Sequence, residues 1–394
     1  MASKSCLEIA FIFGLVLVCT NAEGKVFNVL SYGAKADGVT DNSKAFLKAW
    51  ADACKWNGQA KLLIPLLGVY MVNVVKFIGP CEKSTLTFQI KGIIKAPIDP
   101  KSFCNSSWIS FQYINDLKIK GGGTLDGQGS FTWGKHQCSS MTLGFSFVNN
   151  TVVRDIHSIN SKNIHFKVFA CENMTFSHVN ITAPRDSPNT DGIHISHSTN
   201  IHVLDSYIGT GDDCIAMIAG SNNINISGVT CGPGHGISIG SLGNSPNEVV
   251  KDIHVKNCTL IATQNGLRIK TWASSNVGNI TNITFEDIIM EKVRNPIFID
   301  QHYCPIHHCS KQPSLVQIKD VTFNNIRGSS SSQRAVILDC SALFSCEKIN
   351  LNDINLAYHG RHGHAIAFCA HAKGKATGKE LPPSCLKESL NSST

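Results

Sequence analysis

The fold is decided by one pattern that recurs three times: Asp191-Gly192-Ile193-His194-Ile195, Asp213-Cys214-Ile215-Ala216-Met217 and His235-Gly236-Ile237-Ser238-Ile239. The first residues of these segments lie 22 positions apart in both steps. Short apolar runs at a fixed period, separated by Gly, Asn and Asp turns, are typical of a solenoid whose repeats stack on one another. The pattern predicts a parallel β-helix, in which residues one period apart lie about 4.8 Å from each other on successive coils.

The next coil is longer, because Leu267 follows Ile237 by 30 positions. Extra loop residues lengthen a coil without changing the register of its strand. Arg268 and Lys270 lie two positions apart on this expected strand, so they share a face. Leu267 and Ile269 alternate with them and should fill the core. The two cations are therefore expected on the outer face, in one groove with Asp191, Asp213 and His235.

The first 22 residues have the features of a secretory signal peptide. Lys4 precedes an apolar run from Ile9 to Val18, and the run is too short to span a bilayer. Small and polar residues then lead to a cleavage site after Ala22. The sequence therefore predicts a secreted protein, with one β-helix domain over residues 23–386 and a disordered tail over 387–394.

The composition restricts the partner. The formal net charge is +7, and 16 histidines would add positive charge in an acidic compartment. A polyanionic partner follows from this balance, although a cationic chain also gains plain solubility. Nucleic acid is not expected, because the positive charges are scattered and form no basic run.

Cysteines and glycosylation sequons indicate an oxidising compartment. Of the 16 cysteines, 14 remain after removal of the leader, and no C-x-x-C pair with zinc-like spacing occurs. The expected disulfides are Cys340–Cys346, Cys369–Cys385 and Cys214–Cys231. Sequons for N-glycans stand at Asn105, Asn149, Asn173, Asn180, Asn225, Asn257, Asn279, Asn282 and Asn391.

Little helix is expected in this all-β chain. A first strand is predicted at Val26–Leu30, and the apolar spacing of Asp41–Cys54 predicts a helix with Thr40 or Asp41 as its N-cap. Such a helix would cover the open end of the solenoid, although an ordinary surface helix fits the same residues. Asp126 is expected in an Asp-Gly turn away from the acid column.

Three acids converge in the expected groove. Asp212 precedes Asp213 in sequence, and Asp191 should lie one coil away. Carboxylates this close cannot all ionise independently, so at least one pKa should rise. A protonated acid beside ionised ones is the equipment for hydrolysing a glycosidic bond. The competing reading is a calcium-dependent lyase, which His235 and the nearby cations disfavour because they repel a divalent ion.

Four motifs resemble one enzyme family. Asn189-Thr190-Asp191, Gly211-Asp212-Asp213, Gly234-His235-Gly236 and Arg268-Ile269-Lys270 look like the signature motifs of polygalacturonases, glycoside hydrolase family 28. The wording around Ser187–His194, Cys231–Gly243 and Ile299–Cys304 resembles plant members, in particular pollen-type exopolygalacturonases, several of which are allergens. The similarity extends over nearly the whole mature chain.

This resemblance implies a fold, a reaction and a set of roles. The fold would be a right-handed parallel β-helix, and the reaction would be hydrolysis of α-1,4-galacturonosyl bonds with inversion. Asp212 would be the general acid, Asp191 and Asp213 would activate water, and His235 would assist the acid. Substrate would be bound by Asn189, Arg268, Lys270 and Tyr303.

The resemblance also implies the setting. The enzyme would act in the plant cell wall on polygalacturonate as a monomer, with no cofactor, no metal, no nucleic acid and no membrane partner. Exo action from the non-reducing end is expected. The alternatives are an endopolygalacturonase or, in another class, a catalytically silent pectin-binding β-helix.

Overall fold

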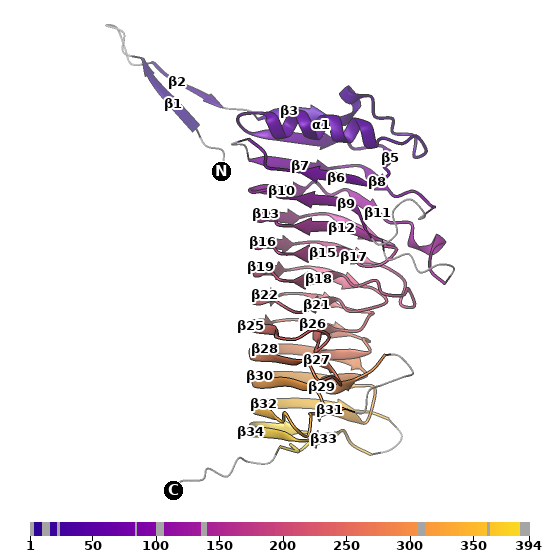
Figure 1. Cartoon of the computed structure of the whole chain (residues 1–394), viewed down its shortest axis with the longest axis vertical. Coiled ribbons are helices and arrows are strands. Elements are labelled where there is room, and N and C mark those ends of the chain that lie inside the picture. The colour runs from indigo at the N-terminus through magenta and orange to yellow at the C-terminus, as the bar shows by residue number, and fades with distance from the viewer. Residues whose placement is uncertain are drawn as a thin grey trace.

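The computed structural model describes residues 4–9, 16–21, 24–82, 85–99, 106–134, 140–305, 312–360 and 363–386. From residue 24 onward the described chain winds into a parallel β-helix whose coils stack along the long axis of the molecule (Figure 1). The predicted all-β solenoid is confirmed. The expected tail, 387–394, lies outside the described residues.

The N-terminal segment stands apart from the stack in Figure 1. Its strands β1 (Lys4–Ile9) and β2 (Val16–Asn21) pair antiparallel with each other. This strand pairing does not test whether residues 1–22 are a signal peptide, which stays a prediction. Among the described residues, no helix has the length and apolar character needed to cross a membrane.

One face of the solenoid is a continuous parallel sheet, which we call sheet C. Its strands are β6 (Val75–Ile78), β9 (Ser107–Gln112), β12 (Met141–Ser146), β15 (Phe166–Phe169), β18 (Ile193–Ser196), β21 (Ile215–Met217), β24 (Ile237–Leu242), β27 (Asn265–Trp272), β29 (Asn295–Tyr303), β31 (Arg334–Asp339) and β33 (Ile366–Ala370). In its register, Ile193 pairs with Ile215 and Ile215 with Ile237. Ile237 pairs with Leu267, so both the 22-residue and the 30-residue steps are confirmed.

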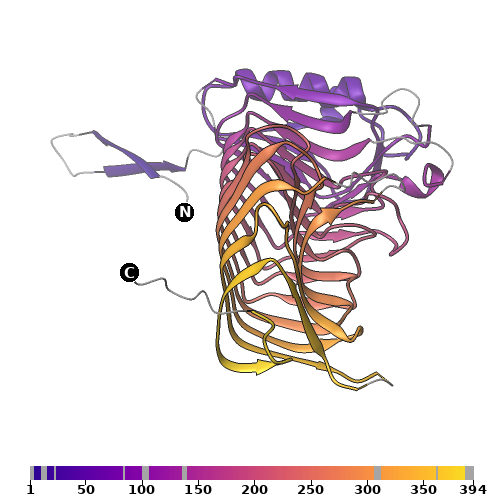
Figure 2. The same ribbon diagram turned by 60° about the horizontal axis from the view of Figure 1, so that its bottom comes forward.

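The remaining faces form a second sheet with two tracks of strands. The first track contains β3 (Lys25–Asn28), β4 (Ala60–Ile64), β7 (Leu86–Ile90), β10 (Leu117–Lys120), β13 (Asn149–Arg154), β16 (Glu172–Ser177), β19 (Thr199–Leu204), β22 (Asn222–Ser227), β25 (Glu248–Lys256), β28 (Val277–Val293), β30 (Leu315–Ser330), β32 (Cys346–Tyr358) and β34 (Ala372–Leu381). The second track contains β5 (Val69–Met71), β8 (Ile93–Lys95), β11 (Thr124–Asp126), β14 (His157–Ile159), β17 (Asn180–Thr182), β20 (Tyr207–Gly209), β23 (Thr230–Cys231) and β26 (Thr259–Ile261). The turned view shows how these walls enclose the interior (Figure 2).

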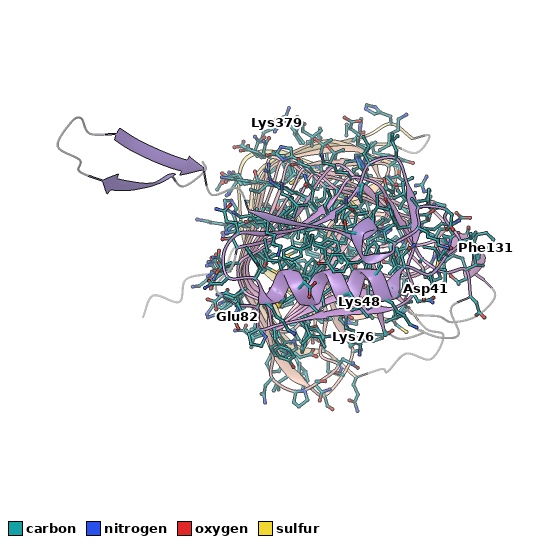
Figure 3. All side chains as sticks on the ribbon, turned by 90° about the horizontal axis from the view of Figure 1, so that it is seen from above. Asp41, Lys48, Lys76, Glu82, Phe131 and Lys379 are labelled. Carbon is teal, nitrogen blue, oxygen red and sulfur yellow. A yellow bond between two sulfur atoms is a disulfide. The ribbon has the colours of Figure 1, made fainter. Side chains whose placement is uncertain are left out.

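Helix α1 (Ser43–Lys55) lies across the first coils at the N-terminal end of the stack (Figure 3). It begins later than predicted. Asn42 occupies the N-cap position without a side-chain cap, while the Asp41 carboxylate accepts a hydrogen bond from the Ser43 amide at 3.0 Å. Trp50 is buried on the inner face of the helix, with its ring centroid 4.9 Å from that of Phe77. The helix therefore covers apolar side chains that would otherwise face water.

The first predicted strand ends early. Strand β3 stops at Asn28, and the 3-10 helix η1 (Val29–Tyr32) follows it. The Asn28 side chain accepts a hydrogen bond from the Leu30 amide at 3.1 Å, which favours a turn over further extension. A second 3-10 helix, η3 (Gly129–Phe131), follows the turn at Asp126. There the Asp126 carboxylate accepts from the Gln128 amide at 3.0 Å, as expected for a turn residue.

The corners of the coils depend on asparagine. Asn150 and Asn173 adopt φ values of 50° and 56°, a left-handed conformation that Asn tolerates better than most residues. Their side chains also stack, because Asn173 Nδ2 donates to Asn150 Oδ1 at 2.7 Å, and Asn150 Nδ2 donates to Asn115 Oδ1 at 2.8 Å. The corner of one coil is thus hydrogen-bonded to the corner of the next.

All three predicted disulfides are present. The structure contains Cys54–Cys81, Cys214–Cys231, Cys340–Cys346 and Cys369–Cys385. The first of these was not predicted, and it connects the end of α1 to the chain that follows β6. Cys171 and Cys258 are buried free thiols, so the expectation that the cysteines are used in disulfides is wrong for these two.

Candidate active site

The acids lie where strands of sheet C begin. Asp191 precedes β18, and Asp213 precedes β21 one coil further on. The Gly192 amide donates to the Asp213 carbonyl at 2.9 Å, and the Cys214 amide donates to the Gly236 carbonyl at 2.8 Å. These contacts connect three successive coils, so the predicted column of Asp191, Asp213 and His235 is formed.

Glycine allows the coils to approach this closely. Gly236 has a φ of 87°, a conformation that other residues rarely adopt. A Cβ at this position would lie 2.1 Å from the Asn265 carbonyl oxygen of the next coil. The backbone therefore requires glycine after His235. The close approach of the two coils at Gly236 also sets the position of the His235 backbone, from which the imidazole extends.

Asp213 is buried and fully engaged. Its Oδ1 accepts hydrogen bonds from Ser238 Oγ at 2.8 Å and from Arg268 Nη2 at 2.6 Å, and its Oδ2 accepts from Lys270 Nζ at 2.8 Å. Burial alone would raise the pKa of Asp213, but the charges of Arg268 and Lys270 outweigh burial and hold this pKa well below its usual range. Asp213 is thus ionised at every pH at which the fold is expected to function.

Asp212 is more accessible and has a different partner. His235 Nδ1 lies 2.9 Å from Asp212 Oδ1, and the Asp213 amide donates to the same oxygen at 2.8 Å. The side chains of Asp212 and His235 are 22% and 33% exposed, so both reach the surface of the groove. Because both contacts fall on Oδ1, neither of these hydrogen bonds uses the other oxygen of Asp212.

Asp191 is paired with a residue that the sequence analysis did not single out. His194 Nδ1 lies 2.9 Å from Asp191 Oδ2. The pKa of Asp191 is raised to about 6, chiefly by burial and also by the charges of Asp212 and Asp213, although the His194 contact lowers it. The spacing of His194, three residues from Asp191 on the outward face of the strand, was the available signal.

Hydroxyl groups support the loops that hold the acids. Thr190 Oγ1 lies 2.7 Å from Ser187 Oγ, and the Gly211 amide donates to Thr190 Oγ1 at 2.9 Å. This chain links the loop before Asp191 to the loop before Asp212. Asn189 is exposed in the first of these loops, with a φ of 54°.

The two predicted cations lie on the outer face of sheet C, as expected from their alternation with Leu267 and Ile269. They are nevertheless buried, because each of their side chains is only 9% exposed. Tyr303 lies beside them, with its ring centroid 6.0 Å from Arg268 Cζ and 5.2 Å from Lys270 Nζ. The structure thus brings together three of the four residues predicted to bind substrate.

Asp300 is a further acid that the sequence analysis missed. It pairs with Lys270 in the register between β27 and β29. Burial raises the pKa of Asp300 despite a hydrogen bond from the His302 amide at 3.0 Å. An outward-facing acid next to the cations extends the charged surface by one coil.

A metal site was the competing use of these acids. Ligand atoms of Asp212, Asp213 and His235 lie within 4.8 Å of one another, which is close enough to hold an ion. Asp213, however, already binds Arg268 and Lys270 through both of its oxygens. Two cations at this distance oppose a divalent ion by Coulomb repulsion, so the residues do not fit a calcium site.

Comparisons with known proteins agree with the motifs. A model described as glycosyl hydrolases family 28 matches residues 54–377. An exopolygalacturonase of Platanus acerifolia is 46% identical over 371 residues, covering 92% of this chain and 98% of the relative. A polygalacturonase of Nicotiana tabacum is 41% identical over 392 residues, covering 97% of this chain and 98% of the relative.

A solved structure supports the fold. Endo-xylogalacturonan hydrolase from Aspergillus tubingensis superimposes with a TM-score of 0.79 at 24% identity, covering 91% of this chain and 100% of that one. The solenoid is right-handed, like those of its structural neighbours. Since the family model matches most of the chain and the relatives align along nearly all of it, the protein belongs to glycosyl hydrolases family 28.

Proposed function

We propose that this glycoside hydrolase cleaves α-1,4-galacturonosyl bonds of polygalacturonate with inversion, and that it acts from the non-reducing end. The observation that carries the proposal is the division of labour among the three acids. Asp213 is held ionised by two cations, Asp212 contacts His235 through one of its two oxygens, and Asp191 contacts only the imidazole of His194 among the hydrogen bonds found for its carboxylate.

In this mechanism Asp212 delivers a proton to the leaving glycosidic oxygen from the oxygen that accepts neither the Asp213 amide nor the imidazole. Loss of the leaving group gives the sugar an oxocarbenium character, which nearby carboxylates stabilise. The Nδ1–H of His235 donates to the other oxygen of Asp212 and keeps the carboxyl group oriented. His235 therefore positions the acid.

Water would be activated mainly by Asp191. His194 occupies Asp191 Oδ2, so Oδ1 is available to accept a proton from water. Both oxygens of Asp213 already accept hydrogen bonds from cations, so its chief contribution is fixed negative charge and the placement of Arg268 and Lys270. This assigns Asp213 a smaller share of water activation than the family resemblance implies.

The substrate class follows from the charge beside the acids. Arg268 donates hydrogen bonds from Nε to Ser238 Oγ and from Nη2 to Asp213 Oδ1. Its guanidinium has further N–H groups beyond these two bonds. A sugar carboxylate would accept from the remaining donors, with Tyr303 next to it. Relatives named exopolygalacturonase and polygalacturonase support this substrate. We also propose that the protein is secreted to the cell wall and acts as a monomer.

Product analysis on polygalacturonate tests the proposal. Galacturonate monomer as the sole early product is the expected result. Mixed oligomers would replace exo action by endo action, and products with unsaturated ends would indicate a lyase. A folded protein that binds the polymer and releases nothing would show a silent binder.

A further inference from the structure

An open hollow of about 320 Å³ lies on the outer face of sheet C, on the N-terminal side of the acids. Lys76 of β6 and Lys167 of β15 line it, together with Ser110, Gly144 and Phe169. Lys76 pairs in register with Ser110, Ser110 with Gly144, and Gly144 with Lys167. Ser110 and Gly144 thus separate the two lysines along one column. Because their side chains are small, the surface between the two lysine side chains is recessed.

The hollow ends one coil from the acids. Lys167 pairs in register with His194, the residue that contacts Asp191. Both side chains point outward on neighbouring strands about 4.8 Å apart. A ligand seated over the acids and extended toward the N-terminal coils therefore meets Lys167 after one coil and Lys76 three coils further on.

The two lysines are not used by the fold. In the described part of the chain, neither ammonium group has an ion pair or a hydrogen bond to another side chain, and the lining of the hollow contains no acidic residue. Lys270, on the same face, is bound to Asp213 at 2.8 Å. The charge of Lys76 and Lys167 is therefore available to an external anion.

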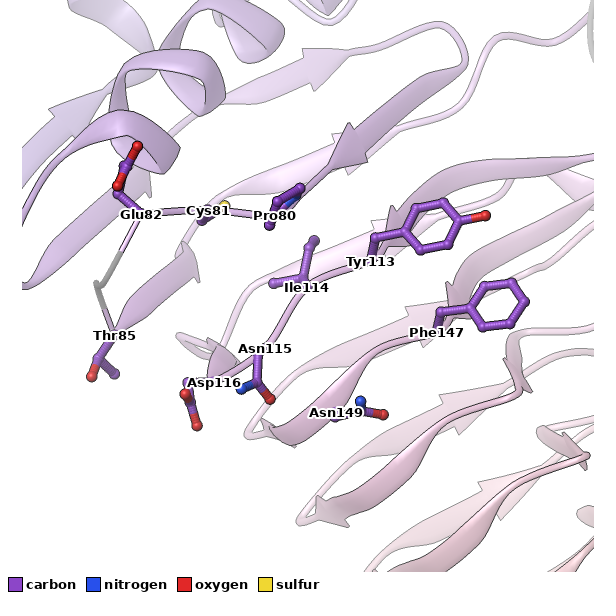
Figure 4. A pocket seen from close by; sticks show the side chains of 10 residues that line it. All are labelled: Pro80, Cys81, Glu82, Thr85, Tyr113, Ile114, Asn115, Asp116, Phe147 and Asn149. Atoms are coloured by element: carbon purple, nitrogen blue, oxygen red, sulfur yellow. The ribbon is translucent and has the colours of Figure 1, made fainter.

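Aromatic rings border the hollow on one side. The Phe169 ring contacts the Phe147 ring edge-on at a centroid distance of 5.8 Å, and Phe147 stacks on Tyr113 at 5.1 Å with an interplanar angle of 4°. Phe147 and Tyr113 are 45% and 56% exposed, and they point in the same direction (Figure 4). Exposed aromatic groups in a row mark a binding surface, and they suit the apolar face of a sugar ring.

A larger hollow of about 660 Å³ lies near the same rings, and its charge is opposite (Figure 4). Glu82 and Asp116 line it together with Asn115 and Asn149. Carboxylates repel a polyanion, so an acidic polysaccharide is directed to the lysine side of the rings.

We propose that Lys76 and Lys167 form a remote subsite for acidic polysaccharide, in which they bind the carboxylates of uronate residues beyond the one being cleaved, beside the ring of Phe169. This inference rests on the proposed function, because it extends the groove of the same substrate. It predicts that the enzyme gains from long substrates through charge at a distance from the acids.

The test is the ratio of kcat/KM for hexagalacturonate to kcat/KM for digalacturonate. Lys76→Gln and Lys167→Gln should each lower this ratio about two- to fivefold, which is typical of one solvent-accessible ion pair, and the double variant should lower it further. The loss should shrink as salt is added, because exposed pairs are screened. Lys167→Arg should keep the ratio, since it retains the charge.

Lys118→Gln is the matched control, because Lys118 is exposed on β10 of the other sheet. It should leave the ratio unchanged, and melting temperatures should show that all variants fold. A ratio in the double variant equal to that of the unaltered chain would overturn the subsite.

Binding supplies a readout that does not depend on turnover. In chains that also carry Asp212→Asn, calorimetric titration with hexagalacturonate should show the same weakening on replacement of both lysines, and equal affinities would overturn the subsite. If the unaltered chain hydrolyses neither oligomer, the proposed function fails, and the calorimetry still decides the subsite.

Discussion

Two regions of the outer face of sheet C use lysine in opposite ways. On the central coils, Lys270 is buried with Arg268 against Asp213. On the N-terminal coils, Lys76 and Lys167 face an open hollow without an acidic partner. All of these strands belong to sheet C, so the difference arises from whether a carboxylate lies within ion-pair distance of the ammonium group, as Asp213 does at 2.8 Å from Lys270. Lys270, which is paired with Asp213, is part of the scaffold. Lys76 and Lys167, which have no acidic partner in the hollow, are available to bind an anionic ligand.

The acids of the central coils differ in the same manner. Asp213 contacts two permanent cations, whereas Asp212 and Asp191 each contact an imidazole. Arg268 and Lys270 fix Asp213 in its ionised form, whereas the hydrogen bonds and ion pairs of the described residues give Asp212 and Asp191 no such permanent cation. Proton transfer is therefore assigned to the acids with histidine partners.

The largest effect is expected for Asp212→Asn. An amide cannot donate the proton that the leaving oxygen requires, so kcat on polygalacturonate should fall by about 10²- to 10⁴-fold. Asp126→Asn is the control, because Asp126 lies in a turn outside the column and its role there needs only a carbonyl oxygen. Initial rates with purified, folded protein provide the measurement. Near-normal turnover by Asp212→Asn would contradict the assignment.

The next effect is on stability. Lys270→Met removes one of the two cations from the buried carboxylate of Asp213, and the free energy of unfolding should fall by about 3–5 kcal/mol. Urea denaturation measures this change. Lys118→Met, on an exposed strand face, should change the free energy by less than about 0.5 kcal/mol. A similarly small loss for Lys270→Met would show that the pair is not part of the scaffold.

This stability should also depend on pH. Folding lowers the pKa of Asp213, so its stabilising contribution is present above the unfolded value of about 3.9 and is lost as pH falls below it. The difference between Lys270→Met and the unaltered chain should therefore be full at pH 6 and decrease in strong acid. A difference that grew in acid would have the wrong sign.

A smaller effect is expected for His194→Ala. The His194 contact lowers the pKa of Asp191, so its removal should raise that pKa above about 6. If ionised Asp191 activates water, the acidic limb of the profile of kcat/KM against pH should move to higher pH. Activity on the acid side should fall severalfold, with less change above the limb. An unmoved limb with a uniformly lower rate would indicate a packing role only.

The lysine subsite carries the smallest predicted effects.

Much of the fold was predictable because the solenoid repeats its own period. The 22-residue step is enough to place Asp191, Asp213 and His235 on adjoining coils, and alternation places Arg268 and Lys270 on the outer face. Local turn chemistry was less predictable, since the side chain of Asn28 ends the first strand. The Cys54–Cys81 bridge depends on how the capping helix lies on the coils, which has no period.

The pairing within the site was not predictable from the repeat. Register places side chains on a face, but rotamers decide which oxygen meets which donor. Ser238 and His194 were missed for this reason, as was the full engagement of Asp213 by both cations. The hollow between Lys76 and Lys167 could not be predicted either. Its prediction requires the register of four coils, and the loops before the regular repeat differ in length.

The most direct test of the account is the anomeric configuration of the first product, followed by proton NMR as the enzyme hydrolyses an α-linked oligogalacturonate. In the proposed roles Asp212 protonates the leaving oxygen and Asp191 activates the water that attacks the sugar, so the newly formed reducing end should first accumulate as the β anomer. Initial accumulation of the α anomer would mean that a carboxylate attacks the sugar itself, and it would contradict the roles given to Asp191 and Asp213.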